Sequence, residues 1–160
     1  MKGPLGTFAV IALAVLAFAP SAQGQAEQTR ESYTERIEPI CKANREANER
    51  IMAGARERIN KDKFVPAGKQ FIRASASVGG LAKRLAAVPP PPADTRRIDR
   101  WLHFIRLLKT RLHNVGKYYK KGRDIKATHE SILAERAGLN ANNVMVVFSQ
   151  LRYCRFGRVD

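Results

Sequence analysis

Apolar side chains recur at alternating steps of three and four residues between Ile98 and Tyr119, in the order Ile98, Trp101, Ile105, Leu108, Leu112, Val115 and Tyr119. This spacing is the pattern of a long amphipathic helix that buries one face. Asp94 or Thr95 is placed to cap its start, and Gly122 in "KKGRD" is placed to end it. We therefore expect a helix here, with Trp101 as a core anchor rather than a platform for a ligand.

Three further segments have a helical period. "SYTE" at Ser32 has the spacing of a capping box, so a first helix is expected to run to about Asn60, although Pro39 favours a later start of its regular part. A second helix is expected to open at Pro66, and a last one near Asp124. Their apolar stripes are Ile37, Ile40, Cys41, Ile51, Ala55 and Ile59; Phe71, Ala74, Val78, Leu81, Leu85 and Val88; and Ile125, Ile132, Leu139, Val146 and Leu151.

Two stretches interrupt these stripes. Gly79 and Gly80 each cost about 1 kcal/mol relative to alanine inside a helix, and we expect the small residues of "ASASVGG" to offset this by letting a neighbouring helix come close. Asn140 to Phe148 disturbs the last stripe. We expect the helix to continue through the asparagines because "VMVVFSQL" resumes the apolar face, and a short strand for "NVMVVF" is the alternative.

The connectors between these helices are short, and "VPPPPAD" cannot be helical. Four amphipathic helices with such connectors predict an all-α fold, an antiparallel up-down-up-down four-helix bundle at residues 32–156. The start of the first helix and the end of the last then lie at the same end of the bundle. The two cysteines are Cys41 and Cys154, so we expect one disulfide that joins the first and last helices, with Cys154 just past the last helix.

The N-terminal segment predicts where the chain resides. Lys2 precedes an apolar run at residues 8–18, and Ala22-Gln23-Gly24 has the small residues of a signal cleavage site. We expect a signal peptide at residues 1–24, cut after Gly24 or alternatively after Ala26, and then a disordered tail at residues 25–31. An uncleaved anchor is the rival interpretation, although a membrane-spanning helix needs about 20 apolar residues. The cleaved protein is expected to be secreted or periplasmic, where disulfides persist.

Several short motifs resemble those of uncharacterised secreted or lipid-anchored helical-bundle proteins common in actinobacteria. These motifs are Ile40-Cys41 with Ala43-Asn44, the link from Pro89 to Pro92 before Trp101, and Leu151 ahead of Cys154 with Gly157 behind it. The chain differs from that class in being basic where the class is often acidic. The resemblance implies a disulfide-stapled bundle and brings no catalytic residue with it.

The sequence favours no catalytic function, and we expect neither an enzyme nor a cofactor. His103 and His113 lie nearly three turns apart, about 15 Å along one helix, and His129 stands elsewhere in the chain. HExxH, CxxC and phosphate-loop motifs are missing, so no metal site or catalytic site is predicted.

Asn44 and Asn48 are unusual because they lie four residues apart, close to the face that carries Cys41 and Ile51. A buried amide without a partner costs about 1–3 kcal/mol. We expect both amides to be hydrogen-bonded in a polar part of the core that fixes helix register. A small-ligand pocket at this end of the bundle is the alternative.

Charge is concentrated in the middle of the chain. The whole sequence has a net charge of +15, and removal of residues 1–24 takes away Lys2 and no acid, leaving +14. Residues 61–93 hold six basic residues against Asp62, and residues 94–123 hold ten against Asp94 and Asp99. Those ten avoid the apolar stripe and are predicted to face solvent: Arg96, Arg97, Arg100, Arg106, Lys109, Arg111, Lys117, Lys120, Lys121 and Arg123.

A basic flank on two neighbouring helices attracts polyanions without sequence-specific contacts. We therefore expect a secreted, non-catalytic bundle that binds an anionic envelope polymer or lipid surface through these residues. Nucleic acid is the less favoured polyanion, since aromatic residues for base stacking are limited to Tyr118 and Tyr119. An extracytoplasmic module that binds a protein partner or acts as a sensor through Asn44 and Asn48 is the alternative function, and an enzyme is the third. The oligomeric state does not follow from the sequence.

Overall fold

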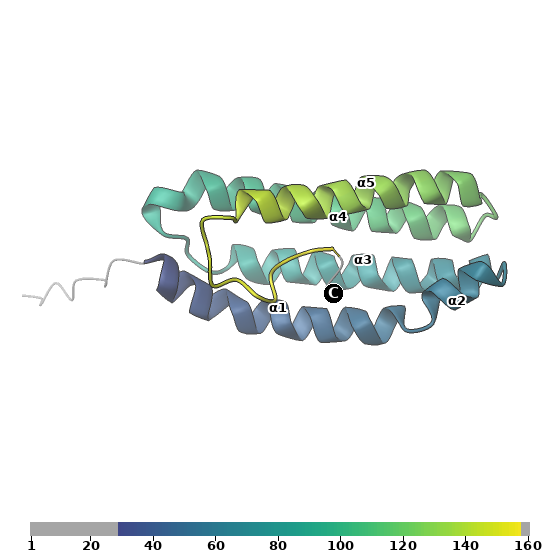
Figure 1. Cartoon of the computed structure of the whole chain (residues 1–160), viewed down its shortest axis with the longest axis horizontal. Helices are drawn as coiled ribbons and strands as arrows, with labels where there is room; N and C mark the ends of the chain where they lie inside the picture. The colour runs from purple at the N-terminus through teal and green to yellow at the C-terminus, as the bar shows by residue number, and fades with distance from the viewer. Residues whose placement is uncertain (1–28, 158–160) are drawn as a thin grey trace, which may run out of the picture.

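The computed structural model describes residues 29–157, and within that range every regular element is helical. These elements are α1 (Arg30–Met52), α2 (Ala55–Asn60), α3 (Phe64–Ala86), the 3₁₀ turn η1 (Pro92–Asp94), α4 (Thr95–Tyr119) and α5 (Asp124–Val144). The long helices alternate in direction and pack α1 on α3, α3 on α4 and α4 on α5 (Figure 1). The predicted all-α, four-helix bundle is confirmed. The predicted signal peptide lies outside the described residues.

The first helix differs from its prediction at both ends. Thr29, not Ser32, is the N-cap of α1, and its hydroxyl accepts a hydrogen bond from the Ser32 amide at 3.2 Å. The helix therefore starts at Arg30, inside the stretch predicted as a tail, and it continues through the exposed Pro39. It ends at Met52 because Gly54 takes a left-handed φ of 70°, so the expected single helix to Asn60 is divided into α1 and α2.

The larger hydrophobic core lies where α1, α3, α4 and α5 meet, and the chain after α5 adds to it. Trp101 is fully buried there, in one cluster with Tyr33, Ile37, Leu85 and Ile105. This position confirms Trp101 as a core anchor. A smaller cluster at the other end of the bundle contains Val115, Tyr119 and Ala127. None of the helices within residues 29–157 is long and apolar enough to cross a membrane.

The apolar stripe predicted for the last helix is wrong. Ile125 is 81% exposed, and Ile132, Leu139 and Val146 are also exposed, at 48%, 49% and 74%. The buried side of α5 is made of small residues instead: Ala127, Ala134, Ala137, Gly138 and Ala141. These small side chains let α5 lie against the large apolar side chains of α4, so the larger residues of α5 are left on its outer side.

The chain after α5 forms a C-terminal strap, residues 145–157. The helix does continue through the asparagines, as predicted, but it stops at Val144 and is followed by turns, neither helix nor strand. The strap crosses from the end of α5 to α1 (Figure 1) and buries Phe148 and Leu151 in the larger core. Its apolar residues therefore contribute to the core without continuing the helix.

The strap carries the disulfide. Cys154 bonds to Cys41 of α1, the two Cα atoms are 5.0 Å apart, and both side chains are 2% exposed. The pairing is confirmed, although Cys154 lies well beyond the end of α5 rather than just past it. The Glu38 carboxylate adds a second tie, because it accepts hydrogen bonds from the backbone amides of Arg152 at 2.9 Å and Tyr153 at 3.1 Å.

Candidate anion-binding surface

The basic residues predicted to face solvent lie on α4 and the turn after it. Eight of the ten are exposed: Arg96, Arg100, Arg106, Lys109, Lys117, Lys120, Lys121 and Arg123. Arg97 and Arg111 are only half-exposed. Since α3 packs against α4, the exposed Lys69, Arg73, Lys83 and Arg84 of α3 extend this basic surface. Arg96 and Arg100 instead line a cleft beside α5, so we call the other ten exposed residues the α3–α4 basic surface.

Arg97 and Arg111 differ from the others because they have partners within the chain. The Arg97 Nε atom lies 3.5 Å from an Asp94 carboxylate oxygen, and Arg97 also donates to the Val144 carbonyl at 3.1 Å. Arg111 donates to both carboxylate oxygens of Glu130 at 3.3 Å. These two guanidinium groups therefore help hold α4 to α5 and are less available to an external anion.

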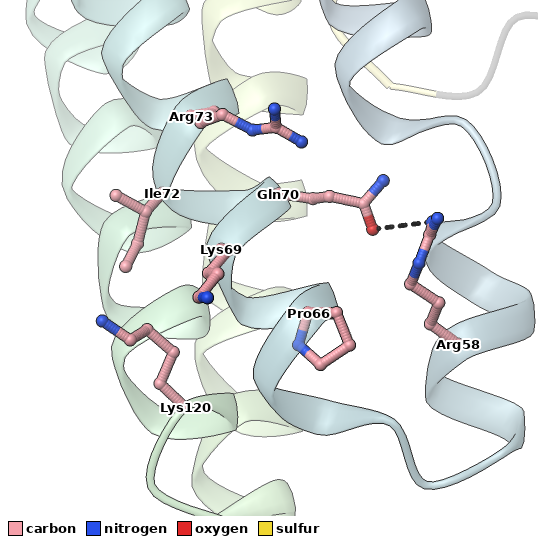
Figure 2. A pocket seen from close by; sticks show the side chains of 7 residues that line it. All are labelled: Arg58, Pro66, Lys69, Gln70, Ile72, Arg73 and Lys120. Atoms are coloured by element: carbon pink, nitrogen blue, oxygen red, sulfur yellow. Dashed lines mark hydrogen bonds between the residues drawn. The ribbon is translucent and has the colours of Figure 1, made fainter.

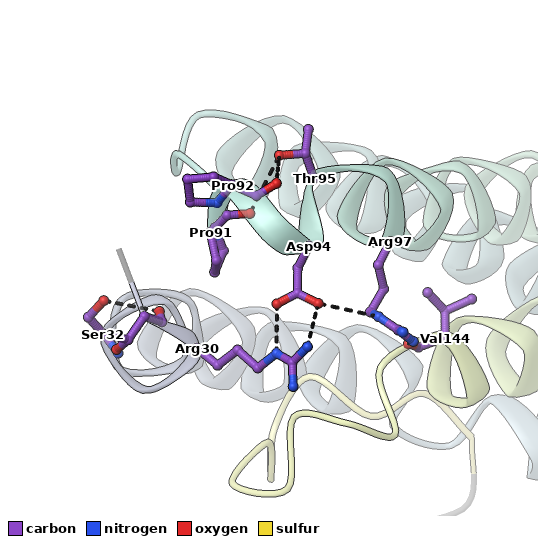
Figure 3. Close-up of polar contacts among 9 residues, drawn as sticks. Arg30, Ser32, Pro91, Pro92, Asp94, Thr95, Arg97 and Val144 are labelled. Carbon is purple, nitrogen blue, oxygen red and sulfur yellow. Dashed lines mark hydrogen bonds and ion pairs between the residues drawn. The ribbon is translucent and has the colours of Figure 1, made fainter. Parts of the chain in front are cut away.

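Asp94 is the buried acid that pairs with Arg97, and Figure 3 shows it between two arginines. Its side chain is 4% exposed and accepts hydrogen bonds from Arg30 Nε at 2.6 Å and Nη2 at 2.9 Å. These bonds lower the pKa of the Asp94 carboxyl against the opposing effect of burial, and the charges of Arg30 and Arg97 add to the lowering. Asp94 occupies the N-cap of α4, as predicted, but its side chain ties α4 to α1 and makes no capping bond.

A cleft with a volume of about 530 Å³ lies where α2, α3 and the end of α4 meet. Figure 2 shows Arg58, Lys69, Arg73 and Lys120 around it, contributed by three different elements. No acidic residue is among those that line the cleft within the described chain. Four positive charges therefore surround one concave site and have no carboxylate there to neutralise them.

Gln70 fixes the Arg58 side of this basic cleft. The Gln70 amide nitrogen donates to the carbonyls of Ile51 at 2.8 Å and Ala53 at 2.9 Å. Its oxygen accepts from Arg58 Nη1 at 3.2 Å, and the same nitrogen of Arg58 donates to the Ala53 carbonyl at 2.9 Å. The chain therefore holds the Arg58 guanidinium in place while Lys69 and Lys120 reach the cleft from α3 and from the end of α4 (Figure 2).

A second groove, of about 650 Å³, runs along the interface of α3 with α4. Lys83, Arg106 and Lys109 line it over a floor that includes Gly79 and Gly80. The expected close helix approach at these glycines is wrong. A Cβ atom at Gly80 would meet nothing within 4 Å, and one at Gly79 would lie 3.5 Å from the side chain of Lys109. The small residues instead leave room along which basic side chains of α4 extend.

A third cleft, of about 550 Å³, lies between α4 and α5 near η1. Arg96, Arg97 and Arg100 line it together with Phe104 and neutral residues of α5. Within residues 29–157, no carboxylate lines this cleft or the α3–α4 groove. Basic concave sites therefore occur near both ends of α4 and beside its middle.

Asn44 and Asn48 form a polar link inside the bundle. Asn44 is 5% exposed and its amide nitrogen donates to the hydroxyl of Ser77 at 2.8 Å and to the Ser77 carbonyl at 3.0 Å. Asn48 donates to the Asn44 oxygen at 2.9 Å. The pair thus ties α1 to α3, as a polar core contact does. Asn48 also lines an apolar cavity, and within the described residues its Oδ1 atom is buried without a hydrogen-bond partner. A ligand-binding role for this residue stays a prediction.

Sequence reasoning located the excess of charge but missed Arg58, Lys69 and Arg73 as residues of one cleft. The four-residue spacing of Lys69 and Arg73 places both on one helix face, and this signal was present in the sequence. Arg58 gave no such signal because α2 was expected to be part of the first helix. His103, His113 and His129 are all exposed, and within residues 29–157 no group of three or more His, Cys, Asp or Glu side chains is placed to hold a metal ion.

No known protein family, curated protein or solved structure matches the chain. The resemblance to actinobacterial secreted bundles therefore stays a prediction. Any functional conclusion depends on the geometry and charge of the described residues.

Proposed function

We propose that this protein is an extracytoplasmic, non-catalytic binding protein that engages an anionic component of the cell envelope through the α3–α4 basic surface. The observation that carries the proposal is the cleft where Arg58 of α2 adjoins Lys69, Arg73 and Lys120 of this surface, because no carboxylate of residues 29–157 is among its lining residues. Bringing like charges together is unfavourable unless an anion neutralises them. A partner with several negative groups would lower that repulsion.

The length of the surface favours an extended or planar partner. The exposed basic residues of this surface run along α4 from Arg106 to the turn at Arg123, and Lys83 of α3 lines the same groove as Arg106 and Lys109. A small anion could contact one cleft, whereas a polymer or a layer of headgroups could contact several at once. Binding of this kind depends on the number of charges neutralised, so it weakens as salt concentration rises.

The cysteines support an extracytoplasmic location. Cys41 and Cys154 form a buried disulfide, and such bonds persist in oxidising compartments but are rare in the cytosol. The signal peptide predicted at residues 1–24 would take the chain to such a compartment. Anionic lipids and polymers of the envelope are the polyanions that a protein would meet there.

Co-sedimentation of the oxidised protein with anionic and neutral vesicles, at low and near-physiological salt, tests the proposal. We expect binding to the anionic vesicles alone, with an affinity that falls as salt is added. Retention on a soluble sulfated dextran distinguishes a polymer partner from a lipid one. The proposal would be abandoned if neither support retained the protein at low salt.

Charge reversal identifies the surface that is responsible. The triple variant Lys69→Glu, Lys109→Glu and Lys120→Glu lies within the basic surface and is expected to lose at least tenfold in affinity for the anionic support.

A matched control changes the net charge equally at exposed basic residues away from that surface, through Arg36→Glu, Arg50→Glu and Arg136→Glu. We expect this control to bind with an affinity much closer to that of the wild type. Equal losses in the two variants would show that net charge alone drives association, with no role for the basic surface.

A further inference from the structure

An apolar cavity of about 490 Å³ that is open to solvent lies among the helices of the bundle, and it shares no lining residue with the basic clefts. Residues of all four long helices and of the strap line it, among them Phe71, Val78, Leu108, Leu112 and Phe156. A volume of this size, with a mostly apolar lining and few polar groups, is typical of small-molecule sites.

The cavity exists because of the side chains that α5 turns inward. Ala134 and Gly138 line it, whereas Ile132 and Leu139 of the same helix are about half exposed. Protein interiors are normally close-packed, and an apolar void forfeits contacts that larger side chains would make. Larger inward-facing residues on α5 would fill the space, so the small residues of this helix leave it open.

The strap forms a fixed wall of the cavity. The Asn142 side chain donates to the Phe156 carbonyl at 2.6 Å and accepts from the Phe156 amide at 2.8 Å. Gly138 allows this approach, since a Cβ atom there would lie 3.1 Å from the Cβ of Phe156. The disulfide at Cys154 holds the strap two residues earlier. The site is therefore formed before a ligand arrives, so binding costs less free energy for ordering the protein.

The polar groups that line the cavity are neutral or acidic, unlike the residues of the α3–α4 basic surface. Among the described residues that line it, the exposed Glu135 is the ionisable one, and Asn48 and Ser131 are neutral. The Ser131 hydroxyl already donates to the Ala127 carbonyl at 3.0 Å. A carboxylate at the edge repels an anionic head group and attracts a cationic or hydrogen-bond-donating one.

We propose that this cavity binds a small amphiphile with one apolar chain and an uncharged or cationic head group. The chain would lie among Phe71, Leu108 and Leu112, and the head group would lie toward Glu135. Such a ligand differs from the polyanion proposed for the basic surface, and its binding would depend on burial of apolar area rather than on salt.

The uncharged fluorescent probe N-phenyl-1-naphthylamine tests the site in the intact oxidised protein. We expect its emission to rise on binding and its affinity to change less than twofold between low and near-physiological salt. Because the probe carries no charge, a failure here is distinguishable from a failure of vesicle binding. No rise in emission with the folded protein would overturn the proposal.

Variants that fill the cavity, together with a matched control, test whether the probe binds there. Ala134→Leu and Ser131→Leu each place a larger apolar side chain into the space, and each is expected to weaken probe binding at least tenfold. Thr128→Leu adds the same side chain at an exposed position of α5 and is expected to bind as the wild type does. Thermal unfolding identifies a filling variant that has lost its fold, and the other variant then decides. Undiminished binding by a folded filling variant would contradict the assignment.

Competition defines the class of ligand. Decanol and decylamine are expected to displace the probe at concentrations several-fold lower than decanoate, because the anionic head group of decanoate would face Glu135. Stronger displacement by decanoate would refute the assigned head-group class.

A variant that ends at Gly157 tests whether residues 158–160 occupy the cavity. Probe binding by that variant, with none by the full chain, would overturn the proposal.

Discussion

Gly68 of α3 and Gly116 of α4 face each other so closely that the carbonyl oxygen of each occupies the space of a side chain on the other. A Cβ atom at Gly68 would lie 2.6 Å from the Gly116 oxygen, and one at Gly116 would lie 2.5 Å from the Gly68 oxygen. The two helices thus approach backbone to backbone at this point. The contact lies beside Lys69 and Lys120, so it also helps to bring two charges of the basic cleft together.

We expect Gly68→Ala to lower the free energy of unfolding by about 1–3 kcal/mol, as overpacking of a tight contact does. The Cβ atom would meet backbone atoms, which cannot move aside as a flexible side chain can. Gly80→Ala is the matched control on the same helix, with open space at its Cβ position, and it is expected to raise the free energy of unfolding by about 0.5–1 kcal/mol. Urea denaturation measures both changes, and effects of the same sign would contradict this prediction.

The buried ion pair of Asp94 with Arg30 makes stability depend on acid pH. The pKa of Asp94 in the folded protein lies below its ordinary value, which is about 3.9 in an unfolded chain. The ionised carboxylate therefore stabilises the fold fully above that unfolded value, and the contribution disappears as pH falls through the folded-state pKa.

Asp94→Asn is expected to be less stable than the wild type near neutral pH and to lose less stability on acidification from about pH 5 to about pH 2. Asp99→Asn removes an exposed carboxylate of the same helix and serves as the control. Urea denaturation at several pH values gives the two slopes. Parallel curves for Asp94→Asn and the wild type would show that the ion pair is not responsible for the pH dependence.

Loss of the disulfide is expected to lower the free energy of unfolding by about 4–5 kcal/mol, the chain-entropy value for a loop of this size. The bond closes a sequence separation of 113 residues. Denaturation of the double variant Cys41→Ala and Cys154→Ala measures the effect, and reduction of the wild type should give the same result. A loss below about 1 kcal/mol would mean that Glu38 and the apolar strap residues hold the strap without the bond.

The architecture could be predicted from the sequence because the patterns that indicate it, apolar stripes and helix-ending residues, are periodic and local. The stripe from Ile98 to Tyr119 repeats over several turns, and proline or glycine marks most helix ends, so the long helices and their order followed. The position of the disulfide then followed from the topology. Local chemistry also placed Asp94 at the start of α4, but its pairing with Arg30 arises from contact between distant segments and has no sequence signal.

The candidate site was harder to predict for the same reason. Charge counts identified α3 and α4 as basic, yet which cations share a cleft depends on how three elements meet around Gln70. The strap was also missed, because Met145, Phe148 and Leu151 continue an apolar pattern without continuing the helix. The periodic spacing of apolar residues indicates which of them can share one face of a helix. It does not report how far the helix extends.

The last helix shows this limit most directly, because α5 carries two stripes with the same seven-residue period. One consists of Ile125, Ile132 and Leu139, continued by Val146 just past the helix, and the other of Ala127, Ala134 and Ala141. Apolarity favours the first as the core face, yet the structure buries the second. The choice depends on the space beside α4, where large side chains already project and small ones on α5 fit.

One alanine substitution in α5 and one in α4 distinguish the two interpretations of which face of α5 is buried. Leu139→Ala, at a side chain that is 49% exposed, is expected to lower the free energy of unfolding by less than about 1 kcal/mol, since most surface substitutions have small effects. Ile105→Ala, at a fully buried position of α4, is expected to cost about 2–5 kcal/mol because it leaves a cavity in the core. Urea denaturation of the two variants under identical conditions gives the comparison. A loss at Leu139 as large as that at Ile105 would mean that the large apolar stripe of α5 is buried in solution, against another part of this chain or against a second molecule.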